Sequence, residues 1–448
     1  MNTHSDRRGS GRILTILGGA AFAGFLAIQF VRPTIAHPPV TAELEAPAEV
    51  RHVLRNSCYD CHSNETKLAW FDQIVPAYWV VANDVKRARS RLNFSEIGKL
   101  PLAQQKATLY EAISQIELGA MPLPPYARLH PSARMTPAQL DVLKNYLNPA
   151  RVNSKTPDSD LAADDSQYQE WLRTGDAERT VQPVSNGIPF PRDYKNWKVI
   201  NGTDRLDNQT MRAILGNPTA MQAIADGHTN PWPDGSTFAK VAWLSRDDGQ
   251  GKVHAGAFFQ VEFMIKDRNK YASTDGWGWA RWRGAGLTPY GKNANFTAEC
   301  TGCHAPLRDS DFVFTVPASM PQTPVKPREW NVITTMVDRP SSTMSTLFGN
   351  DIAVRYARAN SQHDYPAGAQ IALVTWTQQE DPRWFGASIL AQVKSIETVT
   401  VSAGPDNRNT YSYELYEGSP AVKTSASEDH SSGSRADLLL SLRAAVLP

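Results

Sequence analysis

Two short motifs hold all four cysteines of the chain, and they constrain it more than any other feature. Residues 58–62 read CYDCH, and residues 300–304 read CTGCH. This spacing predicts covalent attachment of haem through two thioethers, with the histidine as the proximal iron ligand. The alternatives are a dithiol redox switch, a structural disulfide and half of a zinc site. A zinc site would leave the two histidines unexplained, and neither motif opens a helix after a strand as a thioredoxin-like motif does.

The sequence therefore predicts two covalently attached c-type haems, each held by one motif. The iron ligands from the motifs bind as neutral imidazoles. The thioether residues are Cys58, Cys61, Cys300 and Cys303, and the proximal ligands are His62 and His304.

An uncharged stretch near the amino terminus, residues 13–31, predicts where in the cell the protein is located. It is long enough to cross a bilayer core and longer than the apolar part of a usual cleavable signal. Arginines precede it and only Arg32 directly follows it, which favours a cytoplasmic start and export of the remainder. We expect residues 1–36 to form a signal anchor on the periplasmic side of the bacterial inner membrane. The alternative is cleavage after Ala36, which would leave a soluble periplasmic protein.

Charge and length narrow the class of protein further. The 46 basic and 45 acidic residues balance and no glycine-rich phosphate loop is present, so nucleic acid is not an expected partner. A chain of 448 residues is too long for one core and predicts several domains. The sequence after the first domain is polar and lacks the regularly spaced apolar residues of a core element, which predicts a linker. The expected segments are a haem-binding domain over 37–150, a linker over 151–186, a second haem domain over 187–318, a repeat over 326–423, and a polar tail with a short helix over 424–448.

The first domain is expected to be all-α and cytochrome c-like. Val50, Val53 and Leu54 form an apolar helical stripe that runs into the first motif. Residues 136–139 (TPAQ) form a capping box with proline at the first helical position, which predicts a closing helix. These two helices follow the plan of a class I cytochrome c. The strings SCYDCHSNET, LNFSEI, MPLPPY and HPSAR resemble a bacterial haem-binding domain family that carries one c-haem.

A soft, neutral sulfur is the expected sixth ligand of the first haem if this domain only transfers electrons. Met121 is the candidate, because it lies in a proline-rich loop just before the closing helix. Met135 is the fallback ligand. The alternative for Met121 is a methionine that fills space in the core.

The region over residues 189–317 has a different pattern. Alternation of apolar side chains from Phe259 to Ile265 and the aromatic run at 277–282 predict strands, and Asn217 followed by proline predicts a helix start. We expect an α+β fold with a mostly antiparallel sheet, and the second haem motif late in the domain. NPWPDGSTFAKVAW, GAFFQVEFMIKD, GWGWARW and ECTGCH together resemble the cytochrome P-460 family. Members of that family are β-rich c-haem proteins that oxidise hydroxylamine, related to the nitric-oxide-binding cytochromes c-prime-beta.

The resemblance implies roles for two further residues. In the family a lysine is bonded to a meso carbon of the porphyrin, and the matching position is Lys240. The alternative for Lys240 is a side chain that reaches solvent from a half-buried strand, and the nitric-oxide-binding relatives lack the cross-link. Glu262 matches the distal-pocket acid of the family, and an ion-paired surface glutamate is the alternative. Met264 and Met320 are formal candidates for a sixth ligand here, but packing is the expected role of both.

The remaining sequence is expected to be a second copy of this module without haem. Residues 197–243 align without a gap to residues 330–376 and share 13 identities, which predicts an internal repeat. We expect the two copies to dock as a pseudo-two-fold pair in place of two subunits. The chemical positions differ: Lys240 aligns with Leu373, Glu262 with Gln392, and no cysteine follows.

The leading hypothesis is a membrane-anchored periplasmic oxidoreductase that acts on hydroxylamine or a related nitrogen oxide. A five-coordinate haem beside His304 would bind the substrate, and Glu262 would accept its protons. Electrons would pass to the first haem and then to a soluble or membrane redox partner. The alternative is a haem protein without catalysis that binds nitric oxide or relays electrons.

Overall fold

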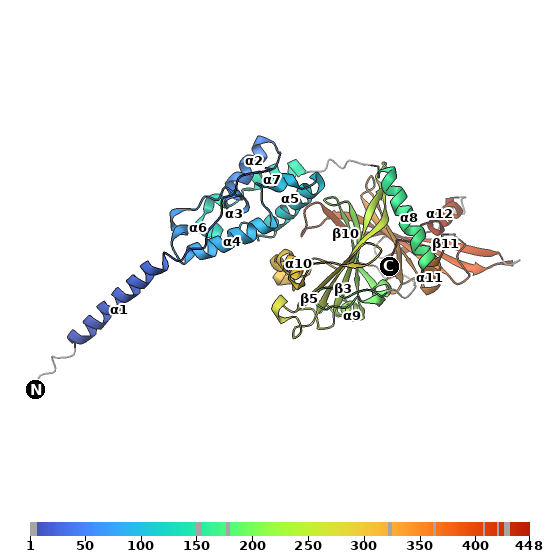
Figure 1. Cartoon of the computed structure of the whole chain (residues 1–448). Helices are drawn as coiled ribbons and strands as arrows, with labels where there is room; N and C mark the ends of the chain where they lie inside the picture. Colours follow the sequence, from blue (N-terminus) through green and yellow to red (C-terminus); the bar gives the residue numbers. More distant parts are fainter. Residues whose placement is uncertain are drawn as a thin grey trace, which may run out of the picture. The chain divides into compact units, whose positions relative to one another are not determined.

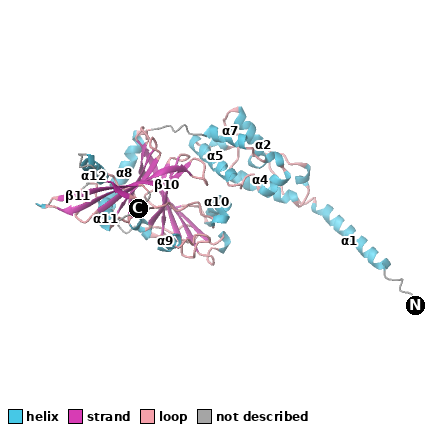
Figure 2. Cartoon of the chain, turned by 180° about the vertical axis from the view of Figure 1, so that it is seen from behind, coloured by secondary structure: helices cyan, strands magenta, loops and turns pink. Residues whose placement is uncertain are grey.

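The computed structural model describes residues 7–147, 155–175, 180–320, 325–361, 364–405, 408–418, 421–424 and 431–448. The chain divides into two compact units, residues 1–148 and 149–448, which are treated separately below. Within the described residues, the regular structure of the first unit is helical, whereas the second is built on an antiparallel sheet (Figures 1 and 2). This division confirms the predicted helical region followed by a β-rich region.

The first unit is a small bundle around the first haem motif. Helix α2 buries Val50, Val53 and Leu54, as the apolar stripe predicts. The capping box is also present, because Gln139 N–H donates to Thr136 Oγ1 at 3.3 Å and Thr136 N–H donates to Gln139 Oε1 at 2.9 Å. Helix α7, which starts there, packs against α2 and α5. The helices are α2 (Ala48–Ser57), α3 (Tyr59–His62), α4 (Ala77–Arg91), α5 (Leu102–Glu117), α6 (Pro124–Leu129) and α7 (Pro137–Leu147).

The sequence predicts a membrane anchor in residues 1–36, and among the described residues no helix is long and apolar enough to cross a membrane. Helix α1 (Arg7–Ile28) covers most of the stretch in question but ends before Val31. Past its end, Gln29 donates to the Val75 carbonyl at 3.0 Å and accepts from the Val75 N–H at 2.9 Å. These two hydrogen bonds tie the end of α1 to the first unit.

Among its described residues, the second unit is built on a 12-stranded sheet. Eight of its strands make a closed circuit in the order β1-β2-β3-β4-β7-β8-β9-β10, because β10 pairs with β1. Strands β5 and β6 extend from β4, and β11 and β12 extend from β10. The strands are β1 (Lys198–Arg205), β2 (Thr210–Gly216), β3 (Thr237–Asp247), β4 (Lys252–Lys266), β5 (Trp277–Arg283), β6 (Thr288–Pro289), β7 (Asn331–Asp338), β8 (Thr343–Gly349), β9 (Gln370–Glu380), β10 (Ala387–Ala403), β11 (Asn409–Glu417) and β12 (Val422–Thr424).

The same order of elements occurs twice in this unit. We call residues 189–320 the first half and residues 325–448 the second half. In each half a helix follows the second strand, namely α9 (Pro218–Ala225) and α11 (Asp351–Ala359). Asn217 and Asn350 cap these helices by accepting from Ala220 N–H at 2.9 Å and Ala353 N–H at 3.0 Å. The halves join through two antiparallel seams, β1 with β10 and β4 with β7.

The sheet of the first half has an apolar face and a polar face. Val241, Trp243 and Phe263 are fully buried in the main hydrophobic core, which takes residues from both halves. Alternate residues on the same strands, including Lys240 and Glu262, lie on the opposite face. The polar face carries the groups described in the next section.

A helix lies where the sequence predicted only a linker. Residues Asp158–Thr174 form α8, which packs against β4. Tyr168 and Trp171 of α8 are buried in the main core, and Asp164 pairs with Arg246 at 2.7 Å. The prediction of a linker over 151–186 is therefore wrong where α8 lies. The side chains of two aromatic residues anchor this otherwise polar helix in the core. Residues 151–154 and 176–179 lie outside the described residues.

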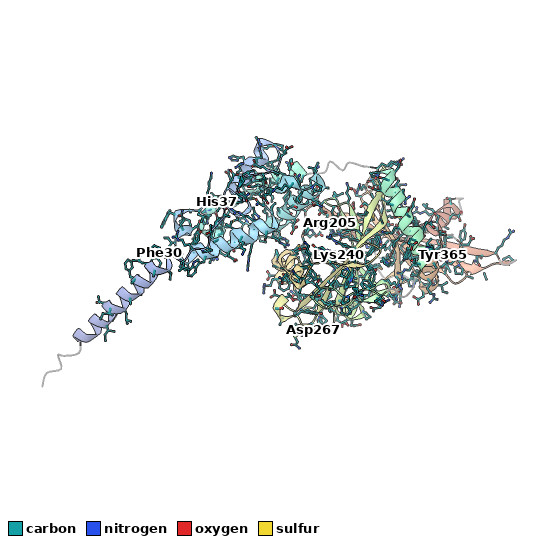
Figure 3. All side chains as sticks on the ribbon, viewed as in Figure 1. Phe30, His37, Arg205, Lys240, Asp267 and Tyr365 are labelled. Carbon is teal, nitrogen blue, oxygen red and sulfur yellow. The ribbon has the colours of Figure 1, made fainter. Side chains whose placement is uncertain are left out.

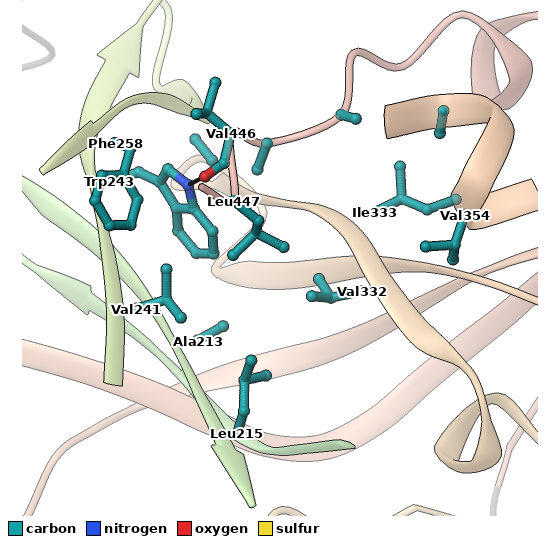
Figure 4. Packing of buried hydrophobic residues seen from close by; sticks show 14 of the residues in the cluster. Ala213, Leu215, Val241, Trp243, Phe258, Val332, Ile333, Val354, Val446 and Leu447 are labelled. Carbon is teal, nitrogen blue, oxygen red and sulfur yellow. Dashed lines mark hydrogen bonds between the residues drawn. The ribbon is translucent and has the colours of Figure 1, made fainter. Parts of the chain in front are cut away.

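The carboxyl-terminal segment is a core element, which corrects the predicted polar tail. The predicted short helix is α12 (Ser431–Leu440), and residues 444–447 after it are buried in the main core. Figure 4 shows Val446 and Leu447 beside Trp243, whose Nε1–H donates to the Val446 carbonyl at 2.8 Å. Residues 425–430 of the predicted tail lie outside the described part.

Candidate functional site

The first haem motif lies at the junction of α2 and α3. Cys58 ends α2, and the single turn of α3 carries Cys61 and His62, both partly buried. His62 Nδ1 lies 3.0 Å from the Leu92 carbonyl, so an N–H at this position donates there, as in histidines that bind a metal through Nε2. Burial lowers the pKa of His62, which favours the neutral imidazole that iron requires.

The two methionines proposed as sixth ligands lie together. Met121 and Met135 line one pocket of about 620 Å³, a volume within the range of ligand sites. The other residues that line it come from α5, α6 and the loops beside them, including Ile116 and Ala127. The structure thus places both candidates at one site, and the choice of Met121 stays a prediction.

The second motif lies on α10 (Thr297–His304), which packs against β5. His304 Nδ1 lies 2.7 Å from the Phe312 carbonyl, which is the same arrangement as at His62. The imidazole ring contacts Trp279, with ring centres 4.6 Å apart, and Phe314, with ring centres 4.8 Å apart. Burial lowers the pKa of His304 to about 3, so the ring is neutral at physiological pH.

An unusual turn presents the carbonyl that holds His304. Asp311 and Phe312 both have positive φ angles, 49° and 65°, a conformation that costs free energy for residues other than glycine. A buried ion pair holds the turn, because Asp311 Oδ1 accepts from Lys266 Nζ at 2.7 Å. Asp311 Oδ2 accepts from the Trp232 N–H at 2.9 Å. Strand β4 and the loop before β3 therefore hold the turn that positions the Phe312 carbonyl.

Lys240 and Glu262 meet on the polar face of the sheet beside this motif. They are direct cross-strand partners on β3 and β4, and Glu262 is the partner of Arg281 on β5. The Glu262 carboxylate contacts Lys240 Nζ through Oε2 and Arg281 Nη2 through Oε1, the latter at 2.5 Å. The structure thus brings together the two residues that the resemblance singled out and adds Arg281 to them.

This face holds a surplus of positive charge. Burial lowers the pKa of Lys240 well below its usual value, and Arg212, Arg281 and Arg205 lower it further. Burial also lowers the pKa of Arg212 to about 9, with a contribution from Arg205. The Cys303 thiol interacts electrostatically with both Lys240 and Arg212, which places the haem motif beside the charges. Figure 3 labels Arg205 and Lys240 in the second unit.

Unpaired polar atoms mark the space between the sheet and α10. Among the described residues, Trp279 Nε1, Arg281 Nε and Gln260 Oε1 are buried without a hydrogen-bond partner. Buried polar atoms are normally paired, so these indicate a polar ligand. A haem fits this donor set: the two cysteines match its vinyl groups, His304 matches its iron, and the cations match its two carboxylates. Cys300, Cys303 and His304 would hold it, next to Lys240.

Three arginines of this face were missed by the sequence reasoning. Arg281 had a detectable signal, because it alternates with Trp277 and Trp279 on a strand that was predicted. Arg205 and Arg212 carried no such signal, since they come from two other strands. Met264 and Met320 pack against hydrophobic clusters, as the sequence led us to expect.

The second half holds an acid at the position of Glu262. Leu373 takes the place of Lys240, and its cross-strand partner is Glu397. The alignment of Glu262 with Gln392 is therefore wrong, because the β9–β10 loop (381–386) is longer than the β3–β4 loop (248–251) and shifts the register. Glu397 accepts from Tyr413 Oη at 2.8 Å and from Arg435 Nε and Nη2 at 2.5 and 2.7 Å. Here a helical arginine of α12 neutralises the acid.

Comparison with known proteins identifies two families in the chain. The model of a haem-binding domain family matches residues 23–149. The model of the cytochrome P-460 family matches residues 191–315 and 324–432, which together make up more than half of the chain. No curated protein matches the chain.

Proposed function

This chain belongs to the cytochrome P-460 family and is a haem protein with a haem-binding domain at its amino-terminal side. From this premise we propose that it oxidises hydroxylamine, or a related small nitrogen oxide, at a haem beside His304. The observation that carries the proposal is the cluster of Lys240, Glu262 and Arg281 on the face that adjoins Cys303 and His304.

Each residue of the cluster has a task in this proposal. A haem held by Cys300, Cys303 and His304 would supply an iron site for the substrate nitrogen and for one-electron transfer. The Glu262 carboxylate accepts protons released by the substrate, because it is largely buried and held at one place on the sheet. Arg281 keeps the carboxylate oriented through its contact with Oε1. The buried surroundings keep bulk water from competing for the same protons.

Lys240 is proposed to be bonded to the porphyrin, as in the family. Nucleophilic lysines react as the neutral amine. Burial and the nearby arginines lower the pKa of Lys240, which favours the neutral amine. We also propose that the first haem is covalently attached at Cys58 and Cys61, with His62 and Met121 as iron ligands. It would receive electrons from the haem at Cys300 and Cys303 and pass them to a separate redox partner.

We further propose that the second half is a haem-free copy of the first. The recurring order of strands, the matching Asn217 and Asn350 caps and the absence of any cysteine after residue 303 support this. Export to the periplasm is proposed on the basis of the amino-terminal apolar stretch and the covalent haem motifs. Cell fractionation with an antibody against the chain tests the location.

Turnover of hydroxylamine tests the proposed function. Purified protein should reduce an artificial electron acceptor when hydroxylamine is added. Glu262→Gln should lower the turnover by about 10²- to 10⁴-fold, which is the usual contribution of a positioned acid or base. The matched control is Glu397→Gln, which changes the same register position in the second half and should leave turnover intact.

Binding without turnover would contradict the proposal. A wild-type protein that binds nitric oxide in the ferrous state but never reduces the acceptor would support the non-catalytic alternative. Equal activity of wild-type protein and Glu262→Gln would remove Glu262 from the mechanism.

A further inference from the structure

A loop of the second half reaches the haem site of the first half. Residues 381–386, between β9 and β10, lie beside the end of β1, because Leu206 N–H donates to the Gly386 carbonyl at 2.9 Å. The β1–β10 seam continues from there, with Arg205 opposite Ala387. The haem-free half thus comes into contact with the polar face that holds Lys240.

Arg383 of this loop binds the segment that follows the second haem motif. Its Nη1 donates to the Val313 carbonyl at 2.8 Å and to the Phe314 carbonyl at 2.9 Å. Phe314 packs on His304, and the preceding carbonyl, of Phe312, accepts from His304 Nδ1. A guanidinium of the second half therefore adds to the contacts that hold the backbone next to the proximal histidine.

Trp384 of the same loop packs beside Phe314 and Arg205, next to the second haem motif. Its ring packs against Phe314 with centres 5.8 Å apart, and the Arg205 guanidinium lies over it at 4.0 Å. Trp384 Nε1 is buried and has no hydrogen-bond partner in the described part of the chain. A buried free donor of this kind indicates a ligand acceptor beyond the protein.

The corresponding loop of the first half lacks these features. Residues 248–251 make the equivalent turn between β3 and β4, and Arg339 N–H donates to the Gly251 carbonyl at 2.9 Å, as Leu206 does to Gly386. That loop contains only Asp248, two glycines and Gln250, and it faces the half without a haem motif. The longer loop with arginine and tryptophan occurs only on the side that faces His304.

We propose that the second half forms one wall of the haem pocket of the first half, and that Arg383 and Trp384 are positioning residues for His304. This inference rests on the proposed haem at His304. The second half would then influence ligand binding at that haem, in addition to packing against the core of the first half. Groups that orient a metal-binding histidine typically change metal affinity or activity by about 10- to 100-fold when they are removed.

Hydrogen exchange and ligand binding test the proposal in the full chain. Arg383→Ala should speed amide exchange of residues 312–316 by about tenfold or more, since it removes two hydrogen bonds from a charged donor. It should also change the affinity of the ferric haem for added cyanide by about tenfold. Trp384→Phe keeps the ring and removes the N–H, which isolates that donor; it should alter cyanide affinity but not exchange. Gln250→Ala is the matched control in the equivalent loop and should change neither.

The outcomes separate this inference from the proposed function. If Arg383→Ala carries haem at Cys300 and Cys303 and matches wild type in both exchange and cyanide affinity, the wall has no positioning role. If the wild-type chain carries no haem on those cysteines, the proposed function fails. Faster amide exchange in Arg383→Ala would still show that Arg383 holds residues 312–316. If Arg383→Ala does not fold, Arg383→Lys, which keeps one donor, replaces it with the same readouts.

Discussion

The polar face of the sheet shows how one residue type takes two roles. Glu262 and Glu397 occupy the same register position, and both are held by cations. Glu262 contacts Lys240 and Arg281 beside the second haem motif, whereas Glu397 contacts Arg435 and Tyr413 in a half of the unit whose sequence has no cysteine. The residues around each glutamate therefore determine which of the two positions could take part in a reaction.

The turn at Asp311 gives a prediction at this scale. Asp311→Asn leaves the buried Lys266 ammonium without its anion, and breaking such a pair costs about 3 kcal/mol or more. We expect lower resistance of the second unit to urea and an altered ferric spectrum, because the Phe312 carbonyl loses its support. The matched control is Asp309→Asn, at an exposed position two residues away. Unfolding curves and spectra identical to those of wild-type protein would show that the ion pair does not position His304.

Individual elements show what the sequence could and could not predict. The helix that enters the first motif and the strand that carries Phe263 followed from periodicity, because one buried face dominates each. Helix α8 could not be predicted from periodicity, because only Tyr168 and Trp171 anchor an otherwise acidic and polar stretch. The position of Glu397 was missed because the gapless alignment ends at residue 376, and the pairing of Glu262 with Gln392 beyond it did not allow for the longer loop between β9 and β10. The clustering of Arg205, Arg212 and Arg281 depends on pairing between distant strands, which local patterns do not encode.

The seam between β4 and β7 gives a prediction about pH. Burial lowers the pKa of His254, which lies opposite Met336 in this seam. Below the unfolded pKa of about 6.5, the unfolded chain therefore binds a proton that the folded chain resists. The stability that depends on neutral His254 is present above that pH and is lost as the pH falls towards the folded pKa. Thermal unfolding at several pH values should show a weaker acid dependence for His254→Gln; an unchanged pH dependence would rule out this role.

The second unit as a whole is held closed by its own carboxyl terminus. The two seams join the halves reciprocally, and residues 444–447 fill the core that they share. This arrangement is consistent with the expected pseudo-two-fold pairing of two copies. It also explains why neither half should be stable alone, since each contributes strands and side chains to the same core.

Replacing a single buried leucine tests this closure. Leu447 is almost fully buried, whereas Leu438 on α12 is 48% exposed. Leu447→Ala should destabilise the second unit by about 2–5 kcal/mol, the range for large-to-small core changes. Leu438→Ala should stay within about 0.5 kcal/mol of wild type. Urea unfolding followed by tryptophan fluorescence measures both, and equal stabilities would mean that the terminus is not part of the folded core.

The central claim is that a haem on Cys300 and Cys303 is the reacting centre and that Lys240 is bonded to it. Proteolysis of the wild-type protein followed by mass spectrometry of the haem peptides tests this most directly. We predict two haem-bearing species: one with the Cys58 and Cys61 peptide, and one in which the Cys300 and Cys303 peptide and the Lys240 peptide share a single haem. A Cys300 and Cys303 peptide without haem would contradict the claim.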